Sequence, residues 1–273
     1  MLASALSWEA AGGPPRRIVA LAPSAAEILF ALGASDRVVA VPDFTGDLPE
    51  AAGKLRIGGF SPDLERIVAL APDLVVVSRD GTDRTAYEKL KSLGLAVLVT
   101  EARSVAGVLD DIRHVGNALG APAAAGRLVA DLSARIEAVE RRTASRRGSP
   151  PRAVVVIWPD PPVVAGPDSF VGDLLSRAGL VNVVPRKAGE WPRVTYETLA
   201  AWNPDVIVHP ETPENRVAFD RAFGTDGRWR LVPAVRSWRV IALPGAWLER
   251  PGPRLVDALE RLAALEAPGA ERP

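Results

Sequence analysis

One stretch of the sequence occurs twice, and this repeat constrains the fold more than any other feature. The first copy, Leu64–Val77, reads LERIVALAPDLVVV, and the second copy, Tyr196–Val208, reads YETLAAWNPDVIV. The two copies align Glu with Glu, Pro with Pro and Asp with Asp at one constant offset. Each copy predicts a helix that proline ends, a turn that Asp favours, and a buried strand.

A second, weaker repeat runs in the same order along the chain. Ser24–Gly33 reads SAAEILFALG, and Ser169–Gly179 reads SFVGDLLSRAG. Each follows a predicted strand and ends in glycine, which commonly occupies the position just after a helix. Pro-Asp turns are common enough for one match to arise by coincidence. Two matches in the same order favour two similar lobes.

Short runs rich in Val and Ile alternate with helical patterns throughout the chain. The predicted strands are Ile18–Leu21, Val38–Val41, Leu74–Val77, Val97–Val99, Val154–Ile157, Val206–Val208 and Val240–Leu243. The predicted helices between them are Ser24–Leu32, Asp63–Leu70, Thr85–Leu93, Val105–Leu119, Ser169–Ala178, Tyr196–Trp202, Asn215–Phe223 and Arg254–Leu265. Continuous apolar strands alternating with helices indicate parallel sheets built from right-handed βαβ units.

The segment Ala123–Arg146 differs, because it predicts a long helix with no strand beside it. Pro122 suits a first helical position, and Gly148 and two prolines follow the segment. About 24 residues at 1.5 Å each would span roughly 36 Å, enough to bridge two lobes. The fold class expected is therefore α/β, with two parallel-sheet lobes joined by one long helix. The expected domains are residues 1–121, a linking helix at 122–148, and residues 149–273. An ordinary long surface helix in a single domain is the alternative.

Composition excludes several functions. The chain has 33 basic and 33 acidic residues, so its formal net charge is zero, which argues against a nucleic acid or an anionic membrane surface as partner. It has no cysteine, which removes disulfides and thiolate chemistry. No run of about 18 apolar residues predicts a membrane span. Met1–Pro15 lacks a basic start and a long apolar stretch, so it is a poor secretory signal.

Parallel sheets bind ligands beyond the carboxyl ends of their strands, so the residues that follow each strand are the first binding candidates. Tryptophan is enriched, with seven Trp against two Tyr and six Phe. Trp158, Trp191 and Trp247 have Pro or Gly neighbours and are expected in loops, where an indole suits a broad ligand with planar parts. Trp202 is expected in the core.

Four segments resemble the helical-backbone class of periplasmic binding proteins, which serve ABC importers of vitamin B12, ferric siderophores or haem. They are Arg17–Ser24, Ile57–Asp73 (IGGFSPDLERIVALAPD), Glu190–Leu199 (EWPRVTYETL) and Ala246–Arg254 (AWLERPGPR). The resemblance extends from about Arg17 to Leu265, and the last two segments are most similar to the cobalamin-binding branch. It implies a periplasmic or cell-surface monomer that binds cobalamin or a related corrinoid between its lobes. The partners it implies are an ABC permease and its ATPase.

The resemblance also implies a role for the glutamates that the repeat makes equivalent. Glu65 and Glu197 would each pair with arginines of the two permease subunits, and charge-assisted pairs of this kind give orientation as well as affinity. The reading without the resemblance is that each glutamate merely favours its helix N-terminus. The residues expected to contact the ligand are Pro23, Ser24, Phe44, Phe60, Arg79, Asp80, Trp158, Trp191, Arg193, Trp247 and Arg250.

We expect no catalytic residue, no metal site and no cofactor. The sequence lacks a phosphate-binding G-x-x-x-x-G-K-[ST] loop, a G-x-S-x-G elbow and an H-E-x-x-H pair. Of its two histidines, His114 is expected on a helix and His209 at a strand end near the ligand. A receptor for a ferric siderophore or haem is the alternative, because Arg79, Arg193 and Arg250 could bind an anionic ligand. A two-lobed nucleotide-dependent transferase is a further alternative.

Overall fold

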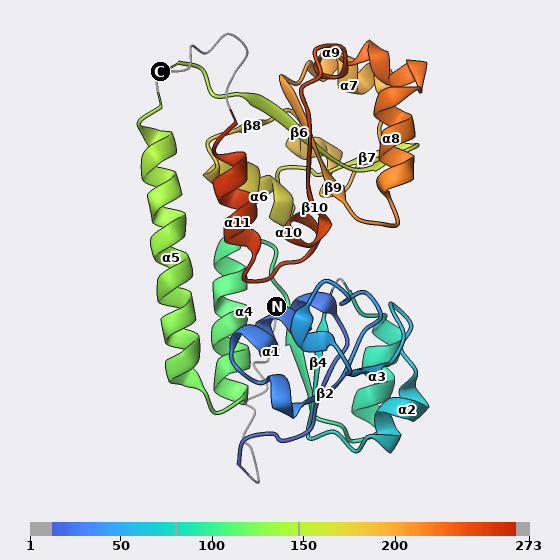
Figure 1. Cartoon of the computed structure of the whole chain (residues 1–273), viewed down its shortest axis with the longest axis vertical. Coiled ribbons are helices and arrows are strands. Elements are labelled where there is room, and N and C mark those ends of the chain that lie inside the picture. Colours follow the sequence, from blue (N-terminus) through green and yellow to red (C-terminus); the bar gives the residue numbers. More distant parts are fainter. Residues whose placement is uncertain (1–12, 80, 147, 266–273) are drawn as a thin grey trace. The chain divides into compact units, whose positions relative to one another are not determined.

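The chain divides into two compact α/β units (Figure 1), which a computed structural model describes at residues 13–79, 81–146 and 148–265. The first unit runs to Ala102 and includes Gly107–Asp131, and the second includes Arg103–Ala106 and continues from Leu132. Asp80 and most of the segment read above as a poor secretory signal lie outside the described residues.

The first unit is built on a five-stranded parallel sheet in the order β3-β2-β1-β4-β5. Its strands are β1 (Ile18–Ala20), β2 (Val38–Val41), β3 (Leu55–Arg56), β4 (Leu74–Ser78) and β5 (Val97–Thr100). The helices of this part of the chain are α1 (Pro23–Ala31), α2 (Leu64–Ala69), α3 (Arg84–Ser92) and α4 (Val105–Ala118), with the 3-10 turns η1 (Ser35–Arg37) and η2 (Pro49–Ala51). Ile67 of α2 and Leu90 of α3 are buried in one core with Val19 and Val75 of the sheet. This burial fixes which sheet face the two helices cover.

The second unit has a parallel sheet in the order β8-β6-β9-β10, to which β7 adds on β6 in the antiparallel direction. Its strands are β6 (Arg152–Pro159), β7 (Pro162–Val164), β8 (Val181–Asn182), β9 (Val206–Glu211) and β10 (Val240–Pro244). Its helices are α6 (Phe170–Arg177), α7 (Tyr196–Trp202), α8 (Arg216–Gly224), α9 (Pro233–Arg236), α10 (Gly245–Glu249) and α11 (Leu255–Leu262), with the 3-10 turns η3 (Arg186–Ala188) and η4 (Gly227–Leu231).

The strand order confirms that the two units are versions of one fold. The order β2-β1-β4-β5 in the first sheet matches β8-β6-β9-β10 in the second. The helices of the weaker repeat, α1 and α6, are both followed by glycines with positive φ, Gly33 at 74° and Gly179 at 69°. Only β3 and β7 lack a counterpart in the other unit.

The stronger repeat is held in each unit by the same set of hydrogen bonds, which we call the Arg–Asp clasp. In the first unit the Asp73 carboxylate accepts the Arg17 backbone N–H at 2.8 Å, and the Arg17 guanidinium donates to the carbonyl of Leu70 just after α2. In the second unit Asp205 accepts the Arg152 backbone N–H at 2.8 Å, and Arg152 donates to Trp202 at the end of α7. The clasp satisfies carbonyls that a helix end leaves unpaired.

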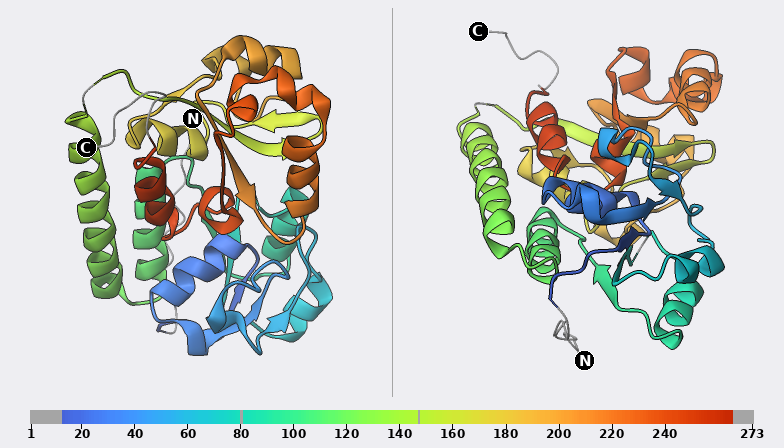
Figure 2. Two further views of the ribbon diagram at one scale, coloured as in Figure 1. Left: turned by 45° about the horizontal axis from the view of Figure 1, so that its top comes forward. Right: turned by 60° about the horizontal axis from the view of Figure 1, so that its bottom comes forward.

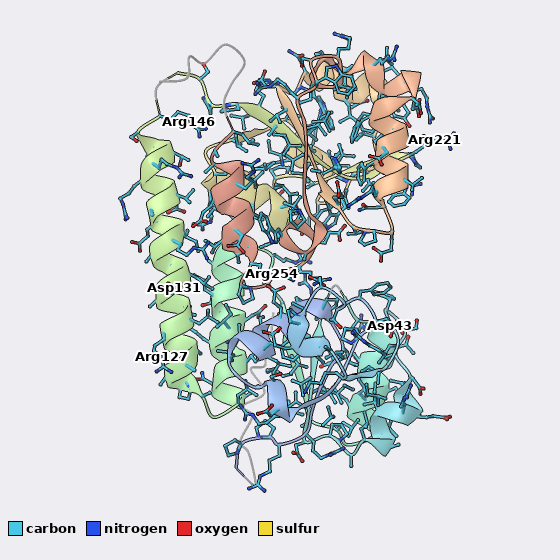
Figure 3. All side chains as sticks on the ribbon, in the orientation of Figure 1. Asp43, Arg127, Asp131, Arg146, Arg221 and Arg254 are labelled. Atoms are coloured by element: carbon cyan, nitrogen blue, oxygen red, sulfur yellow. The ribbon has the colours of Figure 1, made fainter. Side chains whose placement is uncertain are left out.

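The predicted long helix is α5 (Pro122–Ala144), and the chain passes from the first unit to the second within it, after Asp131. It ends two residues earlier than predicted, at Ala144. Arg127 and Asp131 lie on its first half (Figure 3). Its second half is tied to α11, because Arg135 donates to Asp257 at 2.8 Å and to Glu260 at 2.9 Å. Two further views also show α11 beside this half of α5 (Figure 2).

Two of the tryptophans expected in loops belong to regular elements instead. Trp158 lies near the end of β6, which continues through Pro159, and Trp247 lies in α10. Trp191 lies outside the helices and strands, as predicted, and Trp202 packs against the core of the second unit. Among the described residues no helix has both the length and the apolar composition needed to cross a bilayer.

Candidate functional site

The carboxyl edge of the first sheet carries two exposed aromatic rings. Phe44 follows β2 and Phe60 follows β3, which are neighbouring parallel strands, so both loops leave the same edge. Their side chains are 61% and 60% exposed. The Phe44 ring packs on the backbone of Gly59, where an added Cβ would lie only 2.8 Å from its Cε2 atom. A residue larger than glycine at position 59 would displace this ring.

The other predicted residues of the first unit lie beside these rings in sheet order. Pro23 begins α1, with two residues between it and the end of β1, and is half-buried, whereas Ser24 is buried. Arg79 follows β4, its side chain is exposed, and its backbone N–H donates to the carbonyl of Thr100 at 3.0 Å. Asp43 follows β2 (Figure 3), and its N–H donates to Gly58. The edge therefore offers an aromatic pair and one arginine.

In the second unit, β6, β7 and the segment 190–194 form a three-stranded antiparallel ribbon, which we call the tryptophan ribbon (residues 158–164 and 190–194). Trp158 is paired with Val163, and Val163 is paired with Arg193. Directly opposed residues put their side chains on the same face, so Trp158 and Arg193 share one face of the ribbon. A register shift between Val156 and Trp158 sets this alignment.

Trp191 lies on the outer segment of the tryptophan ribbon, two residues before Arg193. The indoles of Trp158 and Trp191 are 45% and 47% exposed. The segment is held by the Gly166 N–H, which donates to the Glu190 carbonyl at 2.8 Å. A Cβ at Gly166 would lie 1.9 Å from the Gly189 oxygen, so this approach requires glycine. The ribbon thus gathers Trp158, Trp191 and Arg193.

Trp247 and Arg250 come from a different element of the second unit. They lie on and just after α10, which directly follows β10, and both are half-buried. Since β6, β9 and β10 are parallel, α10 begins at the same sheet edge at which β6 ends. All the predicted ligand residues in the described part of this unit therefore lie on the ribbon or at this edge.

Sequence reasoning missed a charged cluster beside the ribbon. The Asp160 carboxylate accepts hydrogen bonds from the Tyr196 hydroxyl at 3.0 Å and from the Arg228 guanidinium at 2.8 Å. Arg228 and Tyr196 lower the pKa of Asp160, and burial together with Asp160 raises the pKa of Tyr196 to about 12. Arg228 also pairs with Asp226. No sequence pattern links these residues, because they come from three separate segments, Asp226 and Arg228 lying two positions apart.

His209 and Trp229 are core residues. His209 is buried in β9, stacks on Phe219 with ring centroids 4.2 Å apart, and has its pKa lowered by burial. Its side chain packs on the aromatic rings of the core instead of pointing outward from the strand end. Trp229, to which the sequence assigned no role, is fully buried and meets the edge of Tyr196 at 5.4 Å.

The two glutamates of the repeat occupy equivalent places. Glu65 and Glu197 are exposed in the first turns of α2 and α7. Asp63 caps α2 by accepting the Arg66 N–H, and Thr195 caps α7 by accepting the Thr198 N–H. The backbone N–H of Glu197 and the Thr195 hydroxyl lower the pKa of Glu197, so this carboxylate stays charged. Each unit therefore exposes one glutamate in the first turn of its repeat helix, α2 or α7.

Among the described residues no group of three or more His, Cys, Asp or Glu side chains is arranged to hold a metal ion. His114 is exposed on α4. In each unit exposed aromatic rings and an exposed arginine lie at or beside the carboxyl edge of the sheet.

Comparisons with known proteins agree with this geometry. The model of a family described as "Periplasmic binding protein" matches residues 18–246. An uncharacterised ABC transporter substrate-binding lipoprotein of Bacillus subtilis is 30% identical over 91% of this chain and 79% of its own length.

Two solved structures show the same fold. The periplasmic vitamin B12-binding protein of Vibrio cholerae is 26% identical, with a TM-score of 0.79 over 92% of this chain and 96% of its own. The periplasmic haem-binding protein of Roseiflexus sp. RS-1 is 28% identical, with a TM-score of 0.81 over 91% of this chain and 96% of its own. The chain therefore belongs to the periplasmic binding protein family, the family that its sequence motifs resemble.

Proposed function

We propose that this protein captures cobalamin or a related corrinoid and delivers it to the permease of an ABC importer. The coarser statement, that the chain is a substrate-binding protein of the importer class that carries vitamin B12, haem and siderophores, follows from its family and relatives. Its relatives include periplasmic proteins and a lipoprotein, so we also propose that it works outside the cytoplasm, as a monomer.

The observation that carries the proposal is the exposure of large aromatic rings at the carboxyl edges of both sheets. Phe44, Phe60, Trp158 and Trp191 are each close to half exposed or more. Apolar rings exposed together commonly mark a binding surface, and flat rings suit a flat macrocycle. The vitamin B12-binding relative of Vibrio cholerae supports the choice of a corrinoid.

Haem or a ferric siderophore is the second candidate. Arg79, Arg193 and Arg250 at the sheet edges would bind propionates or anionic iron chelates, and one structural relative is a haem-binding protein. Haem in proteins is commonly held by His, Tyr, Met or Cys. In the described residues, however, His209 faces the core and the Tyr196 hydroxyl is bound to Asp160. This arrangement favours cobalamin, which carries an axial base of its own.

Calorimetric titration decides between these ligands. The protein should bind one cyanocobalamin per chain with micromolar or tighter affinity, and haemin and a ferric hydroxamate should bind more weakly. Heat from haemin or the hydroxamate alone would transfer the proposal to the second candidate. An absence of heat with all three ligands would refute both.

We further propose that Glu65 and Glu197 dock the loaded protein onto the permease. Each is exposed at an equivalent helix start, and a pair of matching carboxylates suits a two-fold symmetric partner. Arginines on the partner would recognise them through charge-assisted hydrogen bonds.

A further inference from the structure

Two sets of contacts in the second unit meet at one residue, Asp160. The Trp158 indole N–H donates to the Asp160 carbonyl at 3.0 Å, which fixes the only polar group of that side chain. The carboxylate of the same residue accepts the Tyr196 hydroxyl at 3.0 Å and the Arg228 guanidinium at 2.8 Å. Asp160, itself a residue of the tryptophan ribbon, therefore binds Trp158 through its backbone and helix α7 through its side chain.

Backbone hydrogen bonds also connect the tryptophan ribbon to the start of α7. The Val194 N–H donates to the Pro162 carbonyl at 2.9 Å, which holds the segment leading into α7 against β7. Thr195 then caps α7, and Tyr196 is its first residue. The centre of the Tyr196 ring lies 4.7 Å from the Cζ atom of the Arg228 guanidinium, and the ring packs on the buried Trp229. The first turn of α7 is therefore continuous with the ribbon that carries Trp158 and Arg193.

The described residues of the first unit show no equivalent arrangement. The position that matches Tyr196 in the repeat is Leu64, whose side chain cannot donate a hydrogen bond. Helix α2 is capped by Asp63, and Leu64 is half-buried against the core. The start of α2, which carries Glu65, thus lacks the side-chain link that the start of α7 possesses.

We propose that Asp160, Tyr196 and Arg228 form a pin that couples the orientation of Trp158 to the first turn of α7. Ligand resting on Trp158 restrains the β6–β7 turn, the turn restrains Tyr196, and the Glu197 carboxylate is ordered as a result. The bonds to the Asp160 carboxylate are charge-assisted on the arginine side, which makes them stronger than neutral hydrogen bonds. Tyr196 and Arg228 are positioning residues, since they act through Trp158 and Glu197. The inference rests on the proposed function for its ligand and for the role of Glu197.

Hydrogen exchange measured by mass spectrometry tests the pin, with Tyr196→Phe as the variant. This change removes only the hydroxyl and keeps the ring against Trp229. The matched control is Tyr87→Phe, which alters the other tyrosine of the chain, on α3 in the first unit. Asp160→Asn is a second variant that weakens both side-chain bonds of the pin. Exchange is followed in peptides covering residues 157–164, 193–202 and 61–70.

Without ligand, Tyr196→Phe should speed exchange in both 157–164 and 193–202 by about three- to tenfold, the effect of losing one hydrogen bond to a charged group near the surface. Tyr87→Phe should leave these peptides unchanged. Saturating cyanocobalamin should slow exchange at 193–202 but not at 61–70 in the wild-type protein. In Tyr196→Phe the ligand should still bind while this protection of 193–202 disappears.

Two results would overturn the pin. One is that the Tyr196→Phe and Asp160→Asn variants without ligand exchange like Tyr87→Phe. The other is that ligand protects 61–70 as strongly as 193–202. A wild-type protein that binds neither cyanocobalamin nor haemin would overturn the proposed function instead, and the measurement without ligand would still decide whether the pin exists.

Discussion

At the scale of single residues, the aromatic side chains divide into two groups that the sequence alone does not separate. Tyr196 and Trp229 belong to the buried core of the second unit, whereas Trp158 and Trp191 leave close to half of their surface exposed. Composition identified tryptophan as unusual, and the neighbouring prolines and glycines singled out Trp158, Trp191 and Trp247 as candidates for ligand contact. Burial, which depends on residues far away in the chain, decides the rest.

The first prediction concerns two of the tryptophans expected to contact the ligand. Trp191→Ala and Trp247→Ala should each weaken cyanocobalamin binding by about 2–4 kcal/mol, the loss typical of truncating an aromatic anchor. Trp238→Ala is the control, because Trp238 is 82% exposed but precedes β10, at the opposite end of the strand from Trp247. Calorimetry provides the measurement. Unchanged affinity in both site variants would mean that the ligand binds elsewhere.

The second prediction concerns His209. Burial lowers its pKa in the folded state, so the unfolded chain takes up the proton first as the pH falls. The contribution of the neutral His209 to the free energy of unfolding is therefore fully present above about pH 6.5. This contribution is lost as the pH falls through that value toward the folded pKa. Burial raises the pKa of Asp111. This shift has the opposite effect on stability, because the folded state takes up the Asp111 proton first as the pH falls.

Urea unfolding of the wild type and of His209→Leu isolates the histidine, since Asp111 is common to both. Wild-type stability should fall more between about pH 7.5 and about pH 5.5 than that of the variant. Parallel pH profiles for the two proteins would show that His209 does not titrate on unfolding in this range.

At the scale of elements, the long and strongly patterned segments were predictable and the short ones were not. Every predicted strand and helix is present, because runs of Val and Ile and helical periodicity are local signals. The strands β3, β7 and β8 have only two or three residues and were not predicted, whereas the equally short β1 lies within the longer apolar run Ile18–Ala22. Helix α10 was expected as a loop because Pro244 and Gly245 precede Trp247, yet they form the start of the helix.

The third prediction concerns Asp173 on α6. Its carboxylate accepts the Val105 N–H at 2.8 Å, which caps α4, and pairs with Arg177 at 3.1 Å. Asp173→Ala should lower stability by about 1–2 kcal/mol, because it leaves a helix start unsatisfied. Asp110→Ala is the control. The Asp110 carboxylate is 62% exposed and pairs with Arg113, three residues further along α4. Its removal should therefore leave the free energy of unfolding almost unchanged. Equal melting temperatures for the two variants would refute the cap.

At the scale of the whole molecule, the repeat was the most informative signal. It predicted two versions of one α/β fold, and the matching strand orders bear this out. The sequence could not reveal the Arg–Asp clasp or the pin at Asp160, because each joins segments more than 35 positions apart. One local sign of the clasp was available: Arg17 and Arg152 each stand at the start of the first strand of a unit.

The fourth prediction tests the proposed docking glutamates. Glu65→Ala with Glu197→Ala should leave cyanocobalamin affinity within about twofold, since neither is among the residues expected to contact the ligand, while transport by the reconstituted importer falls at least about tenfold. Glu88→Ala with Glu137→Ala changes two exposed glutamates on α3 and α5 and should preserve both activities. A collapse of ligand affinity in the first double variant would contradict the docking role.

The backbone of the repeat has one further consequence. Just past α2 and α7 the chain turns through a left-handed residue, Ala71 at φ 43° and Asn203 at φ 47°. Asparagine adopts this conformation far more readily than alanine does. Ala71 therefore adopts the left-handed conformation at a cost of about 1 kcal/mol, whereas Asn203 adopts it at a lower cost. Aligning the two halves of such a chain therefore identifies a stabilising substitution, here Ala71→Asn, without comparison with any other protein.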